Sequence, residues 1–577
     1  MHRAWIAAVA VVTTALLAAA CGAPVVDARE APERQGVARS AVHQAVPPRR
    51  PNIVFVLMDD FSMDLLGTMR SARYMTRHGA SYDNAFVVDS LCCVSRSATF
   101  TGQYPHQTGV LTNTSNLPNR QGPMGGWRGF ARYGNQARTF AVRLQRAGYL
   151  TGYVGKYLNG YEVNARDQAL PPTPPGWSDF RAIFGTAYDG WDFQGLRPAP
   201  KGTSVLRSWP APPATASRKK KDHAYAGTVI GHLAMRFLRA RRSDARPYFL
   251  EVAPYAPHGR VDGRPSYADE SLFPPAYRDQ PGGTHRHGDC GLVACRRLTT
   301  KGLPGFGDRR ADNRPDFRDG RRAPQWNKHP LALTRSQAQT NLRDRARMAQ
   351  SVDRMVMRIL RMVDENTYVV LTSDNGFHLG QLGLLRGKGT AYDTDTHVPV
   401  LVVGPGVVPG ARDTMVSNID WAPTFEALAG LGSPAYRSGT SLVPTFGDPS
   451  AQVADYVYFE HTFSRSRPGA DPDRPFTGGG LNVIPSYVAV RSRTALLVRN
   501  DLDPRWGHHR YAYELYDYTG QRGRAWERAN VYDDPAHAGV VTTLLSKLDQ
   551  WDMCAGLRGA DPVPESCRTL TVEPPLG

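Results

Sequence analysis

The 577-residue sequence predicts an α/β fold with a large, mixed but mostly parallel β-sheet sandwiched by helices. One observation is the apolar run Ile53–Met58, because an uninterrupted run of this length is typical of a strand that is buried on both faces of a parallel sheet. Another is the helical spacing of apolar residues over 352–363, directly before a second strand-like run at 368–373. A helix followed by a strand, in repetition, favours a parallel sheet that is covered by helices.

Four strand-like runs are each followed by polar side chains. In open α/β sheets, ligands bind beyond the carboxyl ends of the strands, so these side chains are expected to meet at one edge. Two adjacent carboxylates repel each other, which favours a bound cation over a solvated turn. The runs are 53–58 with Asp59 and Asp60, 149–154 with Lys156, 248–253 with His258, and 368–373 with Asp374 and Asn375.

The segment around Cys92 carries a family resemblance. A thiol followed by Arg96 and then by Thr101-Gly102 resembles the signature from which sulfatases make their catalytic aldehyde, formylglycine. The blocks that share this resemblance are 50–60 (RPNIVFVLMDD), 91–106 (LCCVSRSATFTGQYPH), 155–161 (GKYLNGY), 174–177 (PPGW), 256–258 (APH), 372–381 (TSDNGFHLGQ), 387–389 (GKG) and 398–399 (VP).

Together these blocks resemble a type I, formylglycine-dependent sulfatase of the alkaline-phosphatase superfamily. The 155–161 and 174–177 blocks are similar to those of N-acetylglucosamine-6-sulfatases and heparan 6-O-endosulfatases in particular. The resemblance implies an alkaline-phosphatase-like sheet in a catalytic α/β domain over 50–435. It also implies a small C-terminal subdomain over 451–577, where 487–491, 495–499 and 514–517 are predicted strands and 540–551 is a predicted helix.

A metal site is predicted at the strand ends. Asp59, Asp60, Asp374 and Asn375 offer only oxygen ligands, which suit Ca²⁺ or Mg²⁺ and argue against zinc. The resemblance implies Ca²⁺, with residue 92 as a further ligand. The ion would polarise a sulfate oxygen and orient the nucleophile.

The resemblance also implies the catalytic roles. Cys92 would be oxidised to formylglycine by a separate formylglycine-generating enzyme and hydrated, after which one hydroxyl attacks sulfur and the other helps to expel sulfate. Arg96, Lys156 and Lys388 would form a cationic clamp, with Arg96 on the nucleophile's oxygen and the lysines on the sulfate. His258 would protonate the leaving alcohol, because an imidazole titrates near working pH.

Two positions depart from the family pattern. Val94 stands where the usual recognition core has Pro, or Ala in some bacterial sequences, so conversion of Cys92 has to be measured. Leu158 replaces a His that helps to release sulfate in many sulfatases. His378 and His106 are the candidate substitutes, and for each of them a structural role is the alternative.

The N-terminus reads as an export signal over 1–21, with a basic start and an apolar stretch that is short for a membrane span. Residues 18–22 resemble a bacterial lipobox, which predicts lipidation of Cys21 and a cell-surface lipoprotein. Conventional cleavage, giving a secreted or periplasmic protein, is the alternative. The Pro-, Ala- and Arg-rich segment 22–49 is predicted to be a flexible tether.

The remaining cysteines agree with export. Cys290 with Cys295 and Cys554 with Cys567 are two local pairs that would form disulfides in an oxidising compartment, which leaves Cys93 as a buried thiol. The formal charge of +18 favours an anionic partner, although an arginine-rich genome explains it equally well. Residues 218–221 (RKKK) are predicted to form an exposed loop. No nucleic-acid-binding motif accompanies the charge.

The sequence therefore predicts an exported sulfatase that acts on a sulfated small molecule or glycan, with the 6-O-sulfate of a glucosamine-type sugar as the expected substrate. One alternative is a phosphodiesterase or phosphonate monoester hydrolase of the same superfamily. Another is an inactive, lipid-anchored glycan-binding protein in which Val94 blocks maturation of Cys92. The loops over 160–225 and 260–340 are expected to decide the substrate.

Overall fold

The computed structural model describes residues 50–114, 123–199, 203–261, 265–308, 312–327, 333–463, 484–503, 505, 507–519 and 526–573. The predicted export signal, its lipobox and the tether lie outside these residues. Residues Arg49–Gly577 form one compact unit. Among the described residues, no helix is both long enough and apolar enough to cross a membrane.

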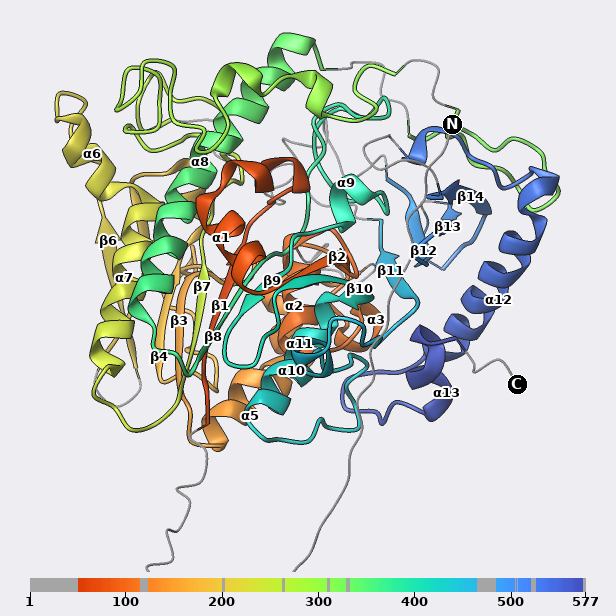
Figure 1. Cartoon of the computed structure of the whole chain (residues 1–577), viewed down its shortest axis with the longest axis horizontal. Coiled ribbons are helices and arrows are strands. Elements are labelled where there is room, and N and C mark those ends of the chain that lie inside the picture. Colours follow the sequence, from red (N-terminus) through yellow and green to blue (C-terminus); the bar gives the residue numbers. More distant parts are fainter. Residues whose placement is uncertain are drawn as a thin grey trace, which may run out of the picture. The chain divides into compact units, whose positions relative to one another are not determined.

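A ten-stranded mixed sheet forms the centre of this unit and confirms the predicted fold class (Figure 1). Its middle strands are parallel to their neighbours, whereas antiparallel pairs occur towards both edges. In spatial order the strands are β10 (Gly410–Ser417), β2 (Ala80–Phe86), β9 (Leu401–Val403), β8 (Thr367–Ser373), β1 (Asn52–Met58), β7 (Tyr248–Ala253), β3 (Leu150–Lys156), β4 (Asp179–Ile183), β5 (Phe193–Pro198) and β6 (Ser204–Trp209).

Strand β1 shows why both faces of this sheet are apolar. Its seven residues are all buried, and successive side chains join different hydrophobic cores. Val54 packs in the core of α1 (Arg70–His78), α7 (Ala226–Arg241) and α8 (Arg335–Met362). Phe55 packs in the core of α5 (Phe140–Arg146) and α10 (Trp421–Leu428). Figure 1 shows α7 beside α8 and α5 beside α10.

A second, antiparallel sheet of four strands follows in the C-terminal part, as predicted. It consists of β11 (Val457–His461), β12 (Ser486–Arg491), β13 (Ala495–Asp501) and β14 (Tyr511–Asp517). Helix α12 (Ala538–Cys554) packs on one face of it through Leu544, Leu548 and Trp551. The boundary between the two predicted domains stays a prediction.

Shorter helices connect these elements. They are η1 (Met63–Thr68), α2 (Cys92–Thr101), α3 (Pro105–Thr108), α4 (Gly126–Arg132), η2 (Asn135–Arg138), η3 (Gly185–Asp189), α6 (Arg218–Ala224), η5 (Cys295–Arg297), η6 (Thr300–Gly302), α9 (Asp393–Thr396), η7 (Asn418–Asp420), α11 (Pro444–Gly447), η9 (Trp526–Arg528), η10 (Pro535–His537), α13 (Glu565–Arg568) and η11 (Thr569–Thr571).

The prediction of an exposed loop at 218–221 was wrong. Residues 218–221 begin helix α6 and do not form a loop, because the Ser217 side chain accepts a hydrogen bond from the Lys220 backbone and caps the first turn. Lys221 is buried, with its ammonium group over the rings of Tyr267 and Tyr277 at 4.4 and 4.5 Å. Only the first three of these basic residues are exposed.

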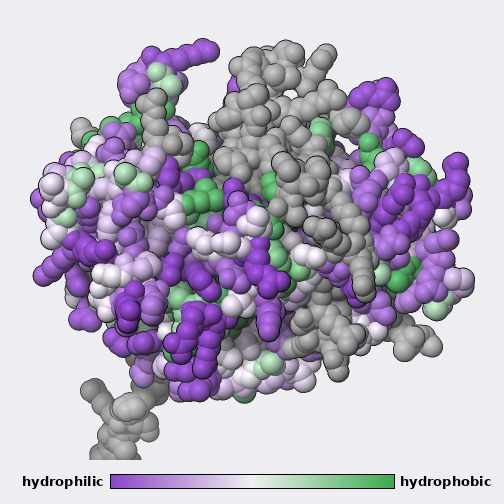
Figure 2. Space-filling model, turned by 90° about the horizontal axis from the view of Figure 1, so that it is seen from above, coloured by the Kyte–Doolittle hydropathy of each residue, from purple (hydrophilic) through white to green (hydrophobic). Residues whose placement is uncertain are grey.

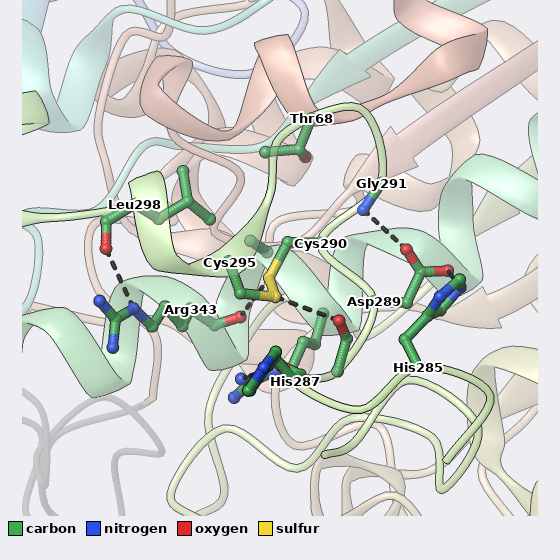
Figure 3. Close-up of a disulfide and its surroundings, with 12 residues drawn as sticks. Thr68, His285, His287, Asp289, Cys290, Gly291, Cys295, Leu298 and Arg343 are labelled. Carbon is green, nitrogen blue, oxygen red and sulfur yellow. Dashed lines mark hydrogen bonds and ion pairs between the residues drawn. A yellow bond between two sulfur atoms is a disulfide. The ribbon is translucent and has the colours of Figure 1, made fainter. Parts of the chain in front are cut away.

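Both predicted disulfides are present, and Cys93 is a buried free thiol. Figure 3 shows the Cys290–Cys295 bridge against helix α8, where Cys290 Sγ lies 3.8 Å from the carbonyl oxygen of Arg343. The Arg343 side chain donates a hydrogen bond to the carbonyl of Leu298, just beyond the bridge. The disulfide therefore holds a turn of the long 260–340 connection against the core helix.

The molecular face in Figure 2 is largely hydrophilic, and its hydrophobic residues form small patches. Scattered exposed hydrophobic residues are normal on protein surfaces.

Glu251 of β7 is a fully buried acid whose carboxylate oxygens accept no hydrogen bond within the described part of the chain. Burial raises its pKa from 4.5 to about 8. The unfolded chain loses this proton first, so stability falls as the pH rises between these two values.

We therefore expect Glu251→Gln to raise the free energy of unfolding by about 3 kcal/mol near pH 7 and to change it little near pH 4.5. Denaturant unfolding at both pH values measures the effect. Glu365→Gln, at an exposed glutamate, is the matched control. An equal change at both pH values would contradict this account of Glu251.

Candidate active site

The four strand ends singled out in the sequence meet at one edge of the large sheet. Their strands are neighbours in the order β8, β1, β7 and β3, and each adjacent pair is parallel. Asp374 and Asn375 follow β8, and Asp59 and Asp60 follow β1. Lys156 is the last residue of β3, and His258 follows β7 after a short turn. The sheet topology thus brings together residues that are up to 316 positions apart, from Asp59 to Asn375.

Cys92 is the first residue of helix α2 and is fully buried at the centre of this group. Its Sγ atom lies 3.4 Å from Asp59 Oδ1 and 3.8 Å from Asp60 Oδ1. The Lys388 ammonium group donates a hydrogen bond to Sγ at 2.7 Å. A helix N-terminus and a buried ammonium both favour negative charge, so the position of Cys92 suits an anionic nucleophile or the oxygens of a sulfate group.

Three buried ion pairs surround Cys92. Lys156 Nζ lies 2.8 Å from each carboxylate oxygen of Asp59, and Lys388 Nζ lies 2.5 Å from Asp60 Oδ1. Arg96 Nε donates to Asp374 Oδ2 at 2.8 Å. These pairs balance three negative charges against three positive ones.

The surroundings act differently on two of these carboxyls. Burial raises the pKa of Asp59, although Lys156 acts in the opposite direction. Against the effect of burial, the positive charges of Arg96, Lys156 and Lys388 hold the pKa of Asp374 below its ordinary value. Asp374 is therefore ionised at neutral pH and keeps its charge next to Arg96.

The donor atoms fit a divalent cation. One ligand atom from each of Asp59, Asp60, Cys92 and His258 lies within 4.8 Å of the others. Asn375 Oδ1 is buried and accepts no hydrogen bond within the described part of the chain, while its amide nitrogen donates to Asp60 Oδ1 at 2.7 Å. A carbonyl oxygen left in this way is an available ligand for a hard cation. With a dication added, the balanced centre would be positive overall, which favours an anionic ligand.

His258 borders this centre with a defined ring orientation. Its Nδ1 lies 2.6 Å from the carbonyl oxygen of Gly259, so Nδ1 carries the proton. Nε2 lies 3.6 Å from Asp60 Oδ2. The ring of Tyr188 packs against the imidazole, with 4.3 Å between the ring centroids, and fixes its plane. His258 therefore presents Nε2 towards the nucleophile and the carboxylates.

The two other histidines singled out in the sequence lie in different places. His378 Nδ1 pairs with Asp395 at 2.8 Å, and its backbone exchanges two hydrogen bonds with Gly387, next to Lys388. His106 lies in α3, beyond the C-terminal end of α2, and pairs with Glu460. Because α2 has ten residues, about 15 Å of helix separates its two ends. The structure thus places His378 beside the loop that carries Lys388. It places His106 at the end of α2 that lies away from Cys92.

Arg345 is a site residue that the sequence analysis missed. It lies in α8, is fully buried, and donates to the backbone carbonyl of Asp60 and to Ser62 Oγ at 3.1 Å. Asp60 has a φ of 57°, which is unusual for a residue other than glycine. The Arg345 hydrogen bonds support this conformation. No local sequence pattern distinguishes Arg345, because Arg343 and Arg347, two residues away on either side, are only partly buried and do not contact the centre.

We expect Arg345→Met to weaken binding of a divalent cation at this centre about tenfold, because Asp60 loses the group that fixes its backbone. Isothermal titration calorimetry with Ca²⁺ measures this, and Arg343→Met, on the same helix, is the matched control. Circular dichroism checks that the variant folds. Unchanged Ca²⁺ affinity in folded Arg345→Met would show that the contact has no influence on the site.

Comparisons with known proteins agree with this geometry. A family model described as Sulfatase matches residues 51–431. The Drosophila melanogaster protein named extracellular sulfatase SULF-1 homolog is 30% identical over 428 residues, or 70% of this chain. The human protein named N-acetylglucosamine-6-sulfatase is 28% identical over 484 residues, which cover 78% of this chain and 76% of that protein.

The chain spans less than two thirds of several of these relatives. The alignments cover 32% of the fly protein, 48% of the Caenorhabditis elegans protein named putative extracellular sulfatase Sulf-1 homolog, and 63% of the goat protein named N-acetylglucosamine-6-sulfatase.

Solved structures share the fold. One is described as a complex with its substrate D-glucosamine-2-N,6-O-disulfate; it has a TM-score of 0.59 at 20% identity and covers 89% of this chain and 100% of that chain. Another is a phosphonate monoester hydrolase from Silicibacter pomeroyi, with a TM-score of 0.59 at 19% identity, over 87% of this chain and 95% of that chain.

Proposed function

The chain belongs to the sulfatase family, and from this premise we propose that it hydrolyses a sulfate ester to an alcohol and inorganic sulfate. The observation that carries the proposal is the position of Cys92, at the N-terminus of α2 between Lys388 and the carboxylates of Asp59 and Asp60. Oxidation of Cys92 by a formylglycine-generating enzyme would supply the aldehyde, whose hydrate provides a hydroxyl for attack on sulfur.

Asp59, Asp60, Asp374 and Asn375 are the residues that we propose hold a divalent cation, together with residue 92. Their oxygen atoms favour Ca²⁺ or Mg²⁺, and we propose Ca²⁺. When bound, the ion would supply Lewis-acid polarisation of a sulfate oxygen. His258 lies within reach of the same atoms, but we propose that it acts in proton transfer instead.

The remaining buried groups suit the charges that develop on the reacting ester. Attack on sulfur breaks the bond between sulfur and the leaving oxygen, and that oxygen then needs a proton. We assign this proton transfer to His258, whose Nε2 faces the centre; because Nδ1–H is held by the Gly259 carbonyl, the proton that is donated is a second one on Nε2, and the ring changes from imidazolium to neutral imidazole. Arg96 and Lys388 hold the oxygen at position 92, and Lys156 and Lys388 stabilise the sulfate oxygens.

The later release of sulfate needs a further group. His378 is better placed for this step than His106, because it lies beside the loop that carries Lys388.

The substrate that we propose is a 6-O-sulfated, glucosamine-type glycan. Two findings support it: the human and goat relatives are named N-acetylglucosamine-6-sulfatase, and a structure with the same fold holds D-glucosamine-2-N,6-O-disulfate. The segments over 160–225 and 260–340, which include β4, β5, β6 and α6, would shape the surroundings of the ester.

Export is part of the proposal. The two disulfides are typical of proteins in oxidising compartments, and the fly relative is named extracellular. We propose a signal over 1–21 with Cys21 as a lipid anchor, a tether over 22–49, a catalytic domain over 50–435 and a subdomain over 451–577. Globomycin sensitivity of the precursor in its host would distinguish lipidation from conventional cleavage.

The second candidate function is hydrolysis of phosphonate monoesters or phosphodiesters. It is considered because the phosphonate monoester hydrolase shares the fold over 87% of this chain. The experiment is a panel of glucosamine 6-sulfate, 4-nitrophenyl sulfate, phenyl phosphonate and bis-4-nitrophenyl phosphate, with protein produced alongside a formylglycine-generating enzyme. Faster turnover of the sulfates supports the proposal. Faster turnover of the phosphorus esters favours the second function, and turnover of none favours a glycan-binding protein.

A further inference from the structure

A cavity of about 920 Å³ lies between α3 with the segment after it and the C-terminal sheet with α12. This volume is within the usual range of small-molecule sites. The residues identified above as the catalytic centre, Cys92, Lys156, His258 and Lys388, are not among its lining residues. The cavity is therefore a separate space that the proposed chemistry leaves unexplained.

The inner wall of this cavity contacts the two loops that carry the nucleophile and its lysine. Nδ1 of His461, a lining residue, lies 3.4 Å from Asp89 Oδ2. Asp89 Oδ1 accepts a hydrogen bond from Leu91 N, directly before Cys92. Tyr487, another lining residue, donates to the carbonyl of Gly389, next to Lys388, at 3.1 Å. The wall of the cavity is thus connected to the residues directly before Cys92 and directly after Lys388.

Two tyrosines give the cavity exposed aromatic surface. Tyr133 and Tyr511 are 43% and 41% exposed, which is unusual for side chains of this size in the described part of the chain. Gly109 makes room for the Tyr133 ring, because a Cβ atom there would lie 2.7 Å from it. Exposed tyrosines offer an apolar face and a polar tip to a ligand that has both.

Most of the charged side chains around the cavity are paired with one another. Arg499 forms two hydrogen bonds with Asp552, at 2.7 and 2.6 Å, and His509 pairs with Asp501 at 2.7 Å. The lining also holds a pair between Arg505 and Asp503. Three arginines and four acidic residues line the cavity, so its wall has no excess of positive charge despite the +18 of the chain. A sulfate group there would meet four carboxylates, and of the three arginines only Arg558, which donates to the backbone carbonyls of Ala555 and Leu557, has no carboxylate partner among the described residues.

Aromatic faces combined with fixed, paired polar groups suit a ligand with apolar C–H faces and many hydroxyl groups. We propose that this cavity binds an uncharged sugar unit of the glycan whose sulfate ester reacts at Cys92. The inference rests on the proposed function for its link to catalysis, and it makes the substrate an oligosaccharide that carries an unsulfated unit besides the sulfated one.

The test uses chitotetraose, an uncharged tetramer of N-acetylglucosamine, and isothermal titration calorimetry. The wild-type protein should bind it, and Tyr133→Ala and Tyr511→Ala should each weaken binding at least about tenfold, or 1.4 kcal/mol. Tyr74→Ala is the matched control, because Tyr74 is 44% exposed on α1 and does not line the cavity. Absence of binding by the wild-type protein, or equal affinity in all variants, would overturn the proposal.

This titration needs neither formylglycine nor a sulfate ester, so its result is independent of the proposed activity. Tyrosine-dependent binding by a protein without sulfatase activity would refute the proposed function and leave the sugar site standing. Sulfatase activity in a protein that shows no tyrosine-dependent binding would refute the sugar site and support the proposed function.

Discussion

Replacing Cys92 with alanine is expected to reduce hydrolysis of sulfate esters about 10⁴- to 10⁶-fold, because the side chain that becomes the nucleophile is lost. Lys388 would keep its pair with Asp60, so the centre should remain folded. Steady-state turnover of glucosamine 6-sulfate measures the loss, and thermal unfolding checks the fold.

Cys93→Ala is the matched control for this variant. Cys93 is the next residue of the same helix and is equally buried, but burial raises its pKa to about 12 and keeps it a neutral thiol. Its loss should change turnover by less than about threefold. If Cys92→Ala kept wild-type turnover, the nucleophile would have to be a different residue.

Replacing Asp60 with asparagine is expected to abolish binding of the proposed cation. Ca²⁺ at about 100 times its Kd should raise the free energy of unfolding of the wild-type protein by about 2.7 kcal/mol. Asp60→Asn should show no such gain, since the site loses a central carboxylate and Lys388 loses its ion partner. Thermal unfolding with and without Ca²⁺ measures both effects.

Asp319→Asn, at an exposed carboxylate, is the control and should keep the full gain. Removing metal with a chelator should lower the melting temperature of the wild-type protein and leave that of Asp60→Asn unchanged. A gain of equal size in Asp60→Asn would place the cation elsewhere in the molecule.

The central strands and their polar ends could be predicted because their signals are local. β1 is apolar at every position after Asn52, and Asp59 and Asp60 follow it directly. The parallel order of β8, β1, β7 and β3 then requires the ends to meet. For β3 only the boundary was wrong, because the strand includes Lys156 instead of ending before it.

The first half of helix α8 and strand β6 have no comparable local sequence pattern. Helix α8 begins at Arg335, whereas the sequence predicts a helix only over 352–363. The first half of the helix was missed because it buries polar residues such as Asn341 and Asp344. A hydrophobic period therefore appears only in the second half. Strand β6 is short and has no buried residue, so its alternation of apolar and polar residues is weak.

The contacts that complete the site depend on tertiary structure. Arg345 reaches Asp60 across 285 positions of the chain, and His461 reaches Asp89 from the second sheet. Neither pair has a sequence spacing that links its members. The sequence therefore predicts which side chains do the chemistry more readily than which side chains hold them.

The most direct test of the central claim is the intact mass of the peptide that contains Cys92, from protein made in its native host or alongside a formylglycine-generating enzyme. We expect the mass of the aldehyde or its hydrate at residue 92, despite Val94 in the recognition segment. An unmodified thiol in that peptide, together with no turnover of sulfate esters, would contradict the proposed mechanism.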